Sequence, residues 1–223
     1  MKLIWLGHGS FRLEAADAVI LIDPWLTGNP AFPENRHAEA LDGATHVLLT
    51  HGHGDHITGV PDIAKDAGLP VYGMFDLMEK LDGVDANGFN KGGTVDLGGV
   101  AVTMVPASHS NTLNGEAAGA EVGYMLKAEG HTIYFSGDTT IMADMEWMGA
   151  YHEPDIGVLS AGGYFTMDMK AAAWAAARYF DFKTVIPMHY KTFPALEQDA
   201  EELKKGLKGV DVIEPEVLVA IEF

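Results

Sequence analysis

A histidine-rich segment that follows a predicted buried strand restricts the fold more strongly than any other part of the chain. It reads Thr50-His51-Gly52-His53-Gly54-Asp55-His56, and the strand before it is predicted over Thr45–Thr50. Its glycines let the backbone turn tightly enough for several side chains to converge on one point. Imidazole and carboxylate groups together suit zinc, iron or manganese. The alternative is a polar loop that is rich in histidine by chance, but only 10 histidines occur in the 223 residues.

Three further residues with metal-binding side chains follow predicted strands elsewhere in the chain. They are His109 after Val100–Val105, Asp138 after Thr132–Phe135, and His189 after Thr184–Pro187. Taken alone, each is more often a turn or cap residue than a ligand. Strand ends on one rim of a sheet sandwich can bring distant residues to a common site. We therefore expect these three residues to lie near the histidine-rich segment.

Strand and helix patterns occur along the whole chain. Apolar, β-branched stretches predict further strands at Lys2–Leu6, Phe11–Glu14, Ala18–Ile22, Val71–Gly73, Val95–Leu97, Val122–Lys127, Ile156–Leu159 and Val217–Ile221. Helices are predicted at Asp62–Ala67, Phe75–Leu81, Asp168–Phe180 with Thr166 as its N-cap, and Ala195–Leu207. The pair Gly98-Gly99 predicts a two-residue hairpin turn.

The order of these elements predicts the architecture. Hairpins come first and strand–helix alternation follows, and this order occurs roughly twice. It indicates two mixed β-sheets packed face to face with helices outside, an α/β sandwich. No shift in composition marks a linker, so residues 1–223 are predicted to form a single domain. The long segment Trp25–Leu41 is predicted to be a functional or mobile loop.

Composition narrows the classes of function. Cysteine is absent, so the chain has no thiolate ligand, no disulfide and no cysteine nucleophile. With 14 basic and 32 acidic residues the net charge is −18, which argues against nucleic acid or an anionic membrane as the main partner. No stretch approaches the roughly 20 apolar residues of a membrane span, and the apolar N-terminal run is short for a signal peptide. We expect a cytoplasmic protein with a small-molecule substrate, and leave a homo-oligomer open.

The succession of motifs resembles the metallo-β-lactamase superfamily. The match runs from Trp5–Phe11 through His-Gly-His-Gly-Asp-His, the single His109 and the pair Gly137-Asp138 to His189. Three segments also resemble a family of bacterial and archaeal metal-dependent hydrolases that is similar to the ascorbate-6-phosphate lactonases. They are Ile22–Pro30, Gly163–Met167 and Ile186–Pro194.

The resemblance implies an αβ/βα sandwich with a two-metal site in the cleft between the sheets. By motif position, the first metal would be held by His51, His53 and His109. The second would be held by Asp55, His56 and His189, and Asp138 would bridge the two. The implied cofactor is a pair of divalent ions, zinc first, with manganese or iron as alternatives.

This ligand set predicts a hydrolase. A water that bridges two cations roughly 3.5–4 Å apart becomes hydroxide near neutral pH, and the cations polarise the scissile carbonyl or phosphoryl group. The expected substrate is small, with an ester, lactone or phosphodiester bond, and Asp55 is the expected catalytic residue because a carboxylate there can also shuttle a proton. The alternative is a metal-binding protein without hydrolytic turnover, such as a metal or redox sensor, with a diiron centre as one form.

Residues around the predicted ligands are weaker candidates. Asp23 either hydrogen-bonds a ligand imidazole or only begins the turn before Pro24. Candidate substrate contacts are Ser108, Tyr164, Tyr190 and Lys191, and a solvated surface lysine is the preferred interpretation of the last. His8 is interpreted as a histidine satisfied within its hairpin rather than as part of the site. The spacing of Met142, Met145 and Met148 predicts helix packing rather than a cofactor site.

Overall fold

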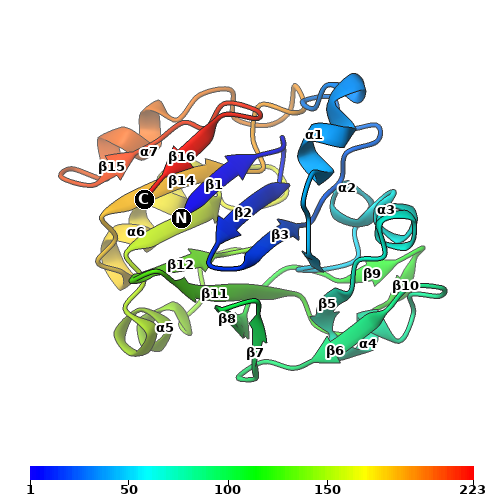
Figure 1. Ribbon diagram of the computed structural model, residues 1–223. Helices are drawn as coiled ribbons and strands as arrows, with labels where there is room; N and C mark the ends of the chain where they lie inside the picture. The colour runs from blue at the N-terminus through cyan, green and yellow to red at the C-terminus, as the bar shows by residue number, and fades with distance from the viewer.

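The computed structural model describes residues 1–223 and contains two seven-stranded β-sheets (Figure 1). The first sheet has the order β16-β1-β2-β3-β4-β5-β6. Its strands are β1 (Lys2–Trp5), β2 (Phe11–Ala15), β3 (Ala18–Ile22), β4 (His46–Leu48), β5 (Val71–Met74), β6 (Ala86–Phe89) and β16 (Ala220–Glu222). The second has the order β15-β14-β13-β12-β11-β8-β7. Its strands are β7 (Thr94–Leu97), β8 (Val100–Pro106), β11 (Val122–Ala128), β12 (His131–Phe135), β13 (Ile156–Ser160), β14 (Thr184–Met188) and β15 (Asp211–Val212).

Each sheet repeats the same plan, as the sequence predicted. In the first, β1, β2 and β3 pair antiparallel, and β3, β4, β5 and β6 then pair parallel. In the second, β7, β8, β11 and β12 pair antiparallel, and β12 to β15 pair parallel. The hairpin turn at Gly98-Gly99 is confirmed, since Leu97 pairs with Val100 and both glycines have positive φ. The predicted fold of two mixed sheets is therefore correct.

The two sheets pack face to face through apolar side chains. Phe11 of β2 and Phe135 of β12 meet edge to face with ring centroids 5.6 Å apart. The Tyr124 hydroxyl of β11 donates to the carbonyl of Leu49 at the end of β4, so a buried polar group also joins the sheets. All five residues of β13 are buried, as expected for a central parallel strand covered on both faces. Each large apolar side chain buried in this way contributes roughly 1.5–3 kcal/mol.

Helices cover the outer faces of the sheets. Figure 1 shows α5 (Met145–His152), α6 (Met169–Tyr179) and α7 (Glu201–Gly206) on the left, and α1 (His37–Leu41), α2 (Gly54–Ile57) and α3 (Val60–Ala67) on the right. The remaining elements are α4 (Phe75–Met78), a 3-10 turn (Glu34–Arg36) and the small hairpin β9 (Thr112–Leu113) and β10 (Glu116–Ala117). None of the helices is both long and apolar enough to span a membrane.

Several sequence predictions of local structure were wrong. The helix predicted over Ala195–Leu207 begins only at Glu201, because the backbone before it pairs with other loops: Glu197 N donates to Gly162 O. The N-cap of α6 is Asp168, whose side chain accepts from Ala171 N, and not Thr166. The predicted loop Trp25–Leu41 contains the 3-10 turn and α1. Strand β6 and the β9–β10 hairpin, which are short and partly exposed, were not predicted.

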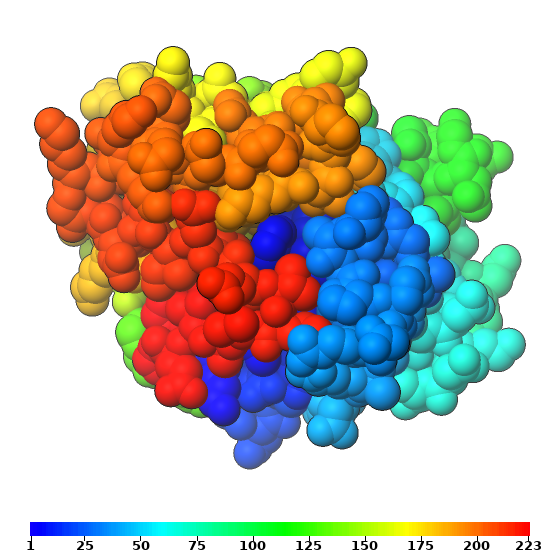
Figure 2. Space-filling view, turned by 90° about the horizontal axis from the view of Figure 1, so that it is seen from above, coloured from blue at the N-terminus to red at the C-terminus, as the bar shows by residue number.

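The topology brings the ends of certain strands to one rim. Strands β3 and β4 are parallel, so the chain beyond Ile22 and the chain beyond Leu48 leave the first sheet side by side. Strands β12, β13 and β14 are parallel, and β8 runs in the same direction because two antiparallel pairings separate it from β12. The predicted site residues all follow these strands. Seen from above in Figure 2, the surface is hollowed where the blue segment after β3, the orange segment after β14 and the red C-terminal segment meet.

Candidate metal centre

Seven residues predicted from the sequence converge at this rim, and Asp138 lies at their centre. Its Oδ2 atom is close to Nε2 of four imidazoles: 3.1 Å for His189, 3.5 Å for His56, 3.6 Å for His109 and 4.0 Å for His51. The Asp138 side chain is buried. One carboxylate oxygen is thus close to ring nitrogens of four histidines, which come from three different parts of the chain.

On one side of Asp138 lies a group of three imidazoles, which we call the first side. It consists of His51, His53 and His109, whose ligand atoms lie within 4.8 Å of one another. Nε2 of His51 is 3.0 Å from Nδ1 of His53. The other nitrogen of His53, Nε2, is 3.3 Å from the hydroxyl of Ser110, which is exposed. His53 and His109 are only partly buried, so this side opens toward solvent.

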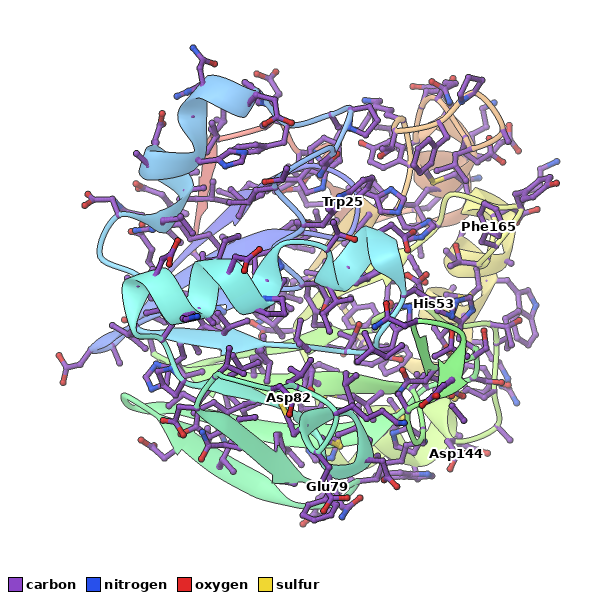
Figure 3. All side chains as sticks on the ribbon, turned by 90° about the vertical axis from the view of Figure 1, so that its right-hand side faces the viewer. Trp25, His53, Glu79, Asp82, Asp144 and Phe165 are labelled. Atoms are coloured by element: carbon purple, nitrogen blue, oxygen red, sulfur yellow. The ribbon has the colours of Figure 1, made fainter.

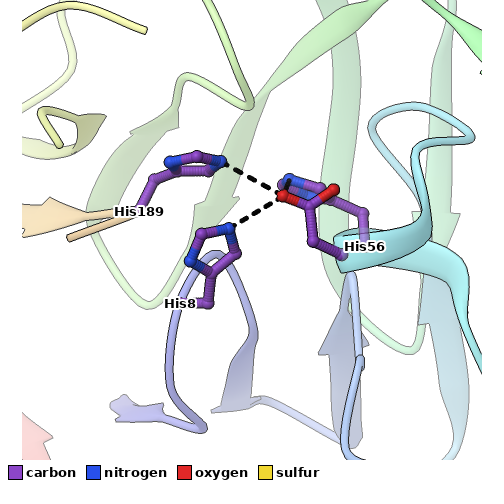
Figure 4. A group of neighbouring side chains, drawn as sticks. His8, His56 and His189 are labelled. Carbon is purple, nitrogen blue, oxygen red and sulfur yellow. Dashed lines mark hydrogen bonds and ion pairs between the residues drawn. The ribbon is translucent and has the colours of Figure 1, made fainter. Parts of the chain in front are cut away.

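On the other side of Asp138 lies a second group, which we call the second side. It consists of Asp55, His56 and His189 together with His8, again with ligand atoms within 4.8 Å of one another. Figure 4 shows the rings of His8 and His189 converging on one carboxylate oxygen, which is Oδ2 of Asp55 at 3.0 Å and 3.5 Å. The three imidazoles of this side are buried, and the Asp55 side chain is 31% exposed.

Asp23 orients one imidazole on each side. Its Oδ2 accepts from Nδ1 of His56 at 2.8 Å and from the Thr50 hydroxyl. Because the Thr50 hydroxyl donates to Asp23, its oxygen accepts from Nδ1 of His51, 2.9 Å away. Both imidazoles thus turn Nδ1 toward the Asp23–Thr50 pair and Nε2 toward Asp138. Asp23 also accepts from the Thr50 backbone N–H at 2.8 Å, so its role exceeds that of a turn-initiating residue.

His8 was missed by the sequence interpretation, which assigned it to a hairpin. It lies in the β1–β2 turn, but its ring enters the second side, with its centroid 3.9 Å from that of His189. Burial lowers the pKa of His8 to about 4, so the ring is neutral. Because a carboxylate only accepts, Nε2–H of His8 donates to Asp55 and Nδ1 accepts from the Thr192 hydroxyl at 2.9 Å. The signal available in the sequence was a glycine-flanked histidine at the same strand rim.

The electrostatics of the two sides differ. Burial lowers the pKa of His51 well below its usual value and also lowers that of His53. Burial opposes charge on His56 and His189 as well, but the Asp138 carboxylate outweighs it. The pKa of His56 is raised well above its usual value, and that of His189 is raised to about 9. Burial would raise the pKa of Asp138, yet the neighbouring imidazoles hold it well below the usual range.

The donor set fits divalent cations. Nε2 of His56 and Oδ1 of Asp138 are buried polar atoms without a hydrogen-bond partner, and both belong to the cluster. Buried polar atoms are rarely left without a partner unless an ion or a functional role accounts for them. Imidazole and carboxylate ligands in this number suit zinc, manganese or iron, and the absence of sulfur ligands argues against a soft metal.

The remaining sequence candidates lie outside the cluster. Tyr190 is buried and stacks on Trp5, so its ring belongs to the core. Lys191 pairs with Glu214 at 2.8 Å, as a surface lysine would. Ser108 is exposed, and its backbone bonds Thr139 and Thr140. Tyr164 is 79% exposed and contacts Phe165 rather than the cluster.

A cavity of about 510 Å³ borders the cluster at His53. It lies between α2 and the start of α3 on one side and the β9–β10 turn on the other. Asp62 is its only charged lining residue. A similar cavity of about 570 Å³ lies between α6 and α7, and none of the cluster residues lines it.

Comparison with known proteins gives consistent matches over the chain. The family model described as the beta-lactamase superfamily domain matches residues 19–190. A UPF0173 metal-dependent hydrolase from Cereibacter sphaeroides is 64% identical and covers 100% of both chains. The structure of Igni18, a metallo hydrolase from Ignicoccus hospitalis, is 30% identical with a TM-score of 0.87, covering 100% of this chain and 98% of that chain.

A further solved structure, the diiron β-hydroxylase CmlA from Streptomyces venezuelae, matches with a TM-score of 0.75 and 15% identity. The match covers 100% of this chain and 54% of that chain. At this identity the likeness concerns the fold alone.

Proposed function

The chain belongs to the beta-lactamase superfamily as one of its metal-dependent hydrolases, and we propose that it cleaves an ester, lactone or phosphodiester bond of a small molecule with two divalent cations. The single observation that carries the proposal is the position of Asp138, whose Oδ2 lies within 4.0 Å of Nε2 of imidazoles on both sides. A carboxylate in that position is suited to bridge two ions.

Each side of the cluster would hold one ion. The first ion would be held by His51, His53 and His109, and the second by Asp55, His56 and His189. This division is supported by the two groups of ligand atoms that lie within 4.8 Å of one another. Zinc is the first candidate, with manganese and iron as alternatives, because the ligands are imidazole and carboxylate.

The bound ions would supply a low-pKa water and polarisation of the scissile group. Asp55 would handle the proton. Its Oδ2 accepts from Nε2–H of His8, and a carboxylate that holds the ion through one oxygen keeps the other to accept a proton from the attacking water. In an ester, the acyl carbon–oxygen bond breaks, water supplies the new oxygen of the acid, and Asp55 returns the proton to the leaving alcohol. His8 acts as a positioning residue that holds the carboxylate of Asp55.

Elemental analysis followed by a substrate panel on the same metallated sample tests the proposal. We expect close to two divalent ions per chain and turnover of activated esters, lactones or phosphodiesters that stops when the ions are chelated. Iron with oxygen-dependent spectra and no hydrolysis would instead favour the alternative of a non-hydrolytic sensor. Full occupancy by a single ion with normal turnover would contradict the bridging role of Asp138.

A further inference from the structure

An exposed aromatic pair lies on the loop between β13 and α6. Tyr164 is 79% exposed and Phe165 is 57% exposed, and their rings meet edge to face at 4.7 Å. We call this pair the aromatic tip. Tyr164 has φ of +60°, a left-handed backbone conformation that is unfavourable for a bulky residue. Packing in the core does not account for two large rings held in solvent, so the tip requires another explanation.

The loop is anchored directly beside the cluster. Ala161 N donates to Met188 O, which precedes His189, and Met167 N donates to Thr139 O, which follows Asp138. Gly162 packs so closely that an added Cβ would lie 1.7 Å from the carbonyl oxygen of His189. Both ends of the loop that carries the aromatic tip are therefore hydrogen-bonded to residues next to predicted metal ligands. Figure 3 shows Phe165, Trp25 and His53 at the same side of the molecule.

The charges around the cluster are acidic. Glu121 accepts from the His109 backbone N–H, and Asp62 lines the cavity beside His53. Glu197 lies beside Gly163, which precedes the aromatic tip. No lysine or arginine lines that cavity. Lys191, two residues after His189, is engaged with Glu214. The cavity beside His53 therefore offers no basic side chain to a substrate.

We propose, on the basis of the proposed function, that the substrate is an ester or lactone whose non-reacting part carries no anionic group, is apolar and lies against Tyr164 and Phe165. A second anionic group, such as a sugar phosphate or a free carboxylate, would meet acidic neighbours on a chain of net charge −18. Phosphorylated lactones are therefore expected to be poor substrates. The two aromatic rings supply an apolar surface for an alkyl or aryl group.

Three 4-nitrophenyl esters of matched length test the charge requirement, because the leaving group stays the same. They are the pentanoate, the glutarate monoester with a free carboxylate, and the 4-(trimethylammonio)butanoate. We expect kcat/KM for the neutral ester to exceed that for the anionic ester by about tenfold or more, since an unpaired carboxylate loses hydration without compensation. Equal or faster turnover of the anionic ester would overturn the proposal, and the cationic ester, which the acidic neighbours do not repel, should not be slower than the anionic one.

Variants of the aromatic tip test where the apolar group binds. In the double variant Tyr164→Ala/Phe165→Ala, kcat/KM for 4-nitrophenyl 3-phenylpropanoate is divided by kcat/KM for 4-nitrophenyl acetate. We expect this ratio to fall about 3- to 10-fold, because the loss of aromatic contacts raises KM for the phenylpropanoate. Tyr151→Ala is the matched control, because Tyr151 is equally exposed, at 79%, but lies on α5. A double variant whose ratio matches that of the control would refute the assignment of the tip.

Two further measurements separate this inference from the proposed function. Calorimetric titration with 4-phenyl-2-butanone, a neutral ketone that is not cleaved, should give weaker binding in the double variant than in the control. In Tyr164→Lys, turnover of the glutarate monoester should rise relative to the pentanoate. If none of the esters is hydrolysed faster by the metallated protein than by the chelated protein, the proposed function fails. If esters are hydrolysed but the anionic one is preferred, only this inference fails.

Discussion

The two sides of the cluster share Asp138 but are supported in different ways. The second side is buried, contains the Asp55 carboxylate, and is held from behind by Asp23 and His8, which are themselves fully buried. The first side contains only imidazoles; buried Thr50 backs His51, but His53 is backed by the exposed Ser110 and His109 is partly exposed. Buried partners fix ligand orientation more firmly than exposed ones, which water can replace. The second side is therefore the pre-organised half of the site, and the first side is the adaptable half.

The largest effect on metal binding and turnover is expected at Asp138, which the two sides share. Changing Asp138 to Asn removes the shared charge, so both ions should be lost or strongly weakened. Turnover should then fall by about a thousandfold or more, because a bound cation supplies several kcal/mol of stabilisation and about 1.4 kcal/mol corresponds to tenfold. Metal content per chain and kcat/KM measure the two effects. A variant that keeps two ions at full occupancy would show that the sides do not depend on Asp138.

Acidification should weaken metal binding on the second side more than on the first. Binding an ion requires neutral imidazoles, and the pKa of His189 is raised to about 9 while those of His51 and His53 are lowered. Below about pH 9, each proton displaced from the second side weakens binding by up to about tenfold per unit of falling pH. The first side should stay nearly flat over the same range. Titrations with Co²⁺ at several pH values, monitored by absorption, measure both slopes, and equal slopes would contradict the distinction.

Removing the orienting carboxylate should affect the second side first. We expect Asp23→Asn to weaken the second ion by about 10- to 100-fold, the usual cost of losing a partner of a ligating histidine. The matched variant is Thr50→Val. It removes the hydroxyl that accepts from Nδ1 of His51 but leaves the direct hydrogen bond between Asp23 and His56, so it should weaken the first ion alone. If Thr50→Val weakens the second ion as strongly as Asp23→Asn does, the assignment of Thr50 to the first side is wrong.

How far the site could be predicted depends on how local its determinants are. The spacing from His51 to His56 and the strand-end positions of His109, Asp138 and His189 are visible in the sequence, because strand topology alone brings such ends to one rim. The hydrogen bond between His8 and Thr192 joins residues 184 positions apart, and only the packing of the β1–β2 turn creates it.

The buried position of Tyr190, a predicted substrate contact, has a backbone cause. His189 and Lys191 both have positive φ, a conformation that residue type does not predict for either, and the chain between them turns the Tyr190 ring into the core. The two-sheet fold was predictable because hairpins followed by alternating strands and helices occur twice along the chain. The start of α7 was not, because the leucine spacing continues through Leu196 while the backbone there bonds to distant loops.

Replacing the ring that holds Asp55 should have a moderate effect on the second side. His8→Phe keeps the ring volume but removes both hydrogen bonds, so the second ion should bind about tenfold more weakly. His8→Gln retains a donor and should restore part of the loss. Because a merely structural role would also lower the melting temperature, calorimetric metal affinity is compared with thermal stability of the metal-free protein. A loss of stability without a change in affinity would remove His8 from the site.

The smallest effect on metal affinity is expected at Ser110, the exposed hydrogen-bond partner of His53. Ser110→Ala removes the hydroxyl 3.3 Å from Nε2 of His53, and water can take its place because the position is exposed. The first ion should therefore bind less than about threefold more weakly, since an exposed hydrogen bond has a small net value. The comparison with Asp23→Asn, measured by the same Co²⁺ titration, is decisive. If Ser110→Ala costs as much affinity as Asp23→Asn, the first side is held as firmly as the second, and burial does not distinguish the two halves of the site.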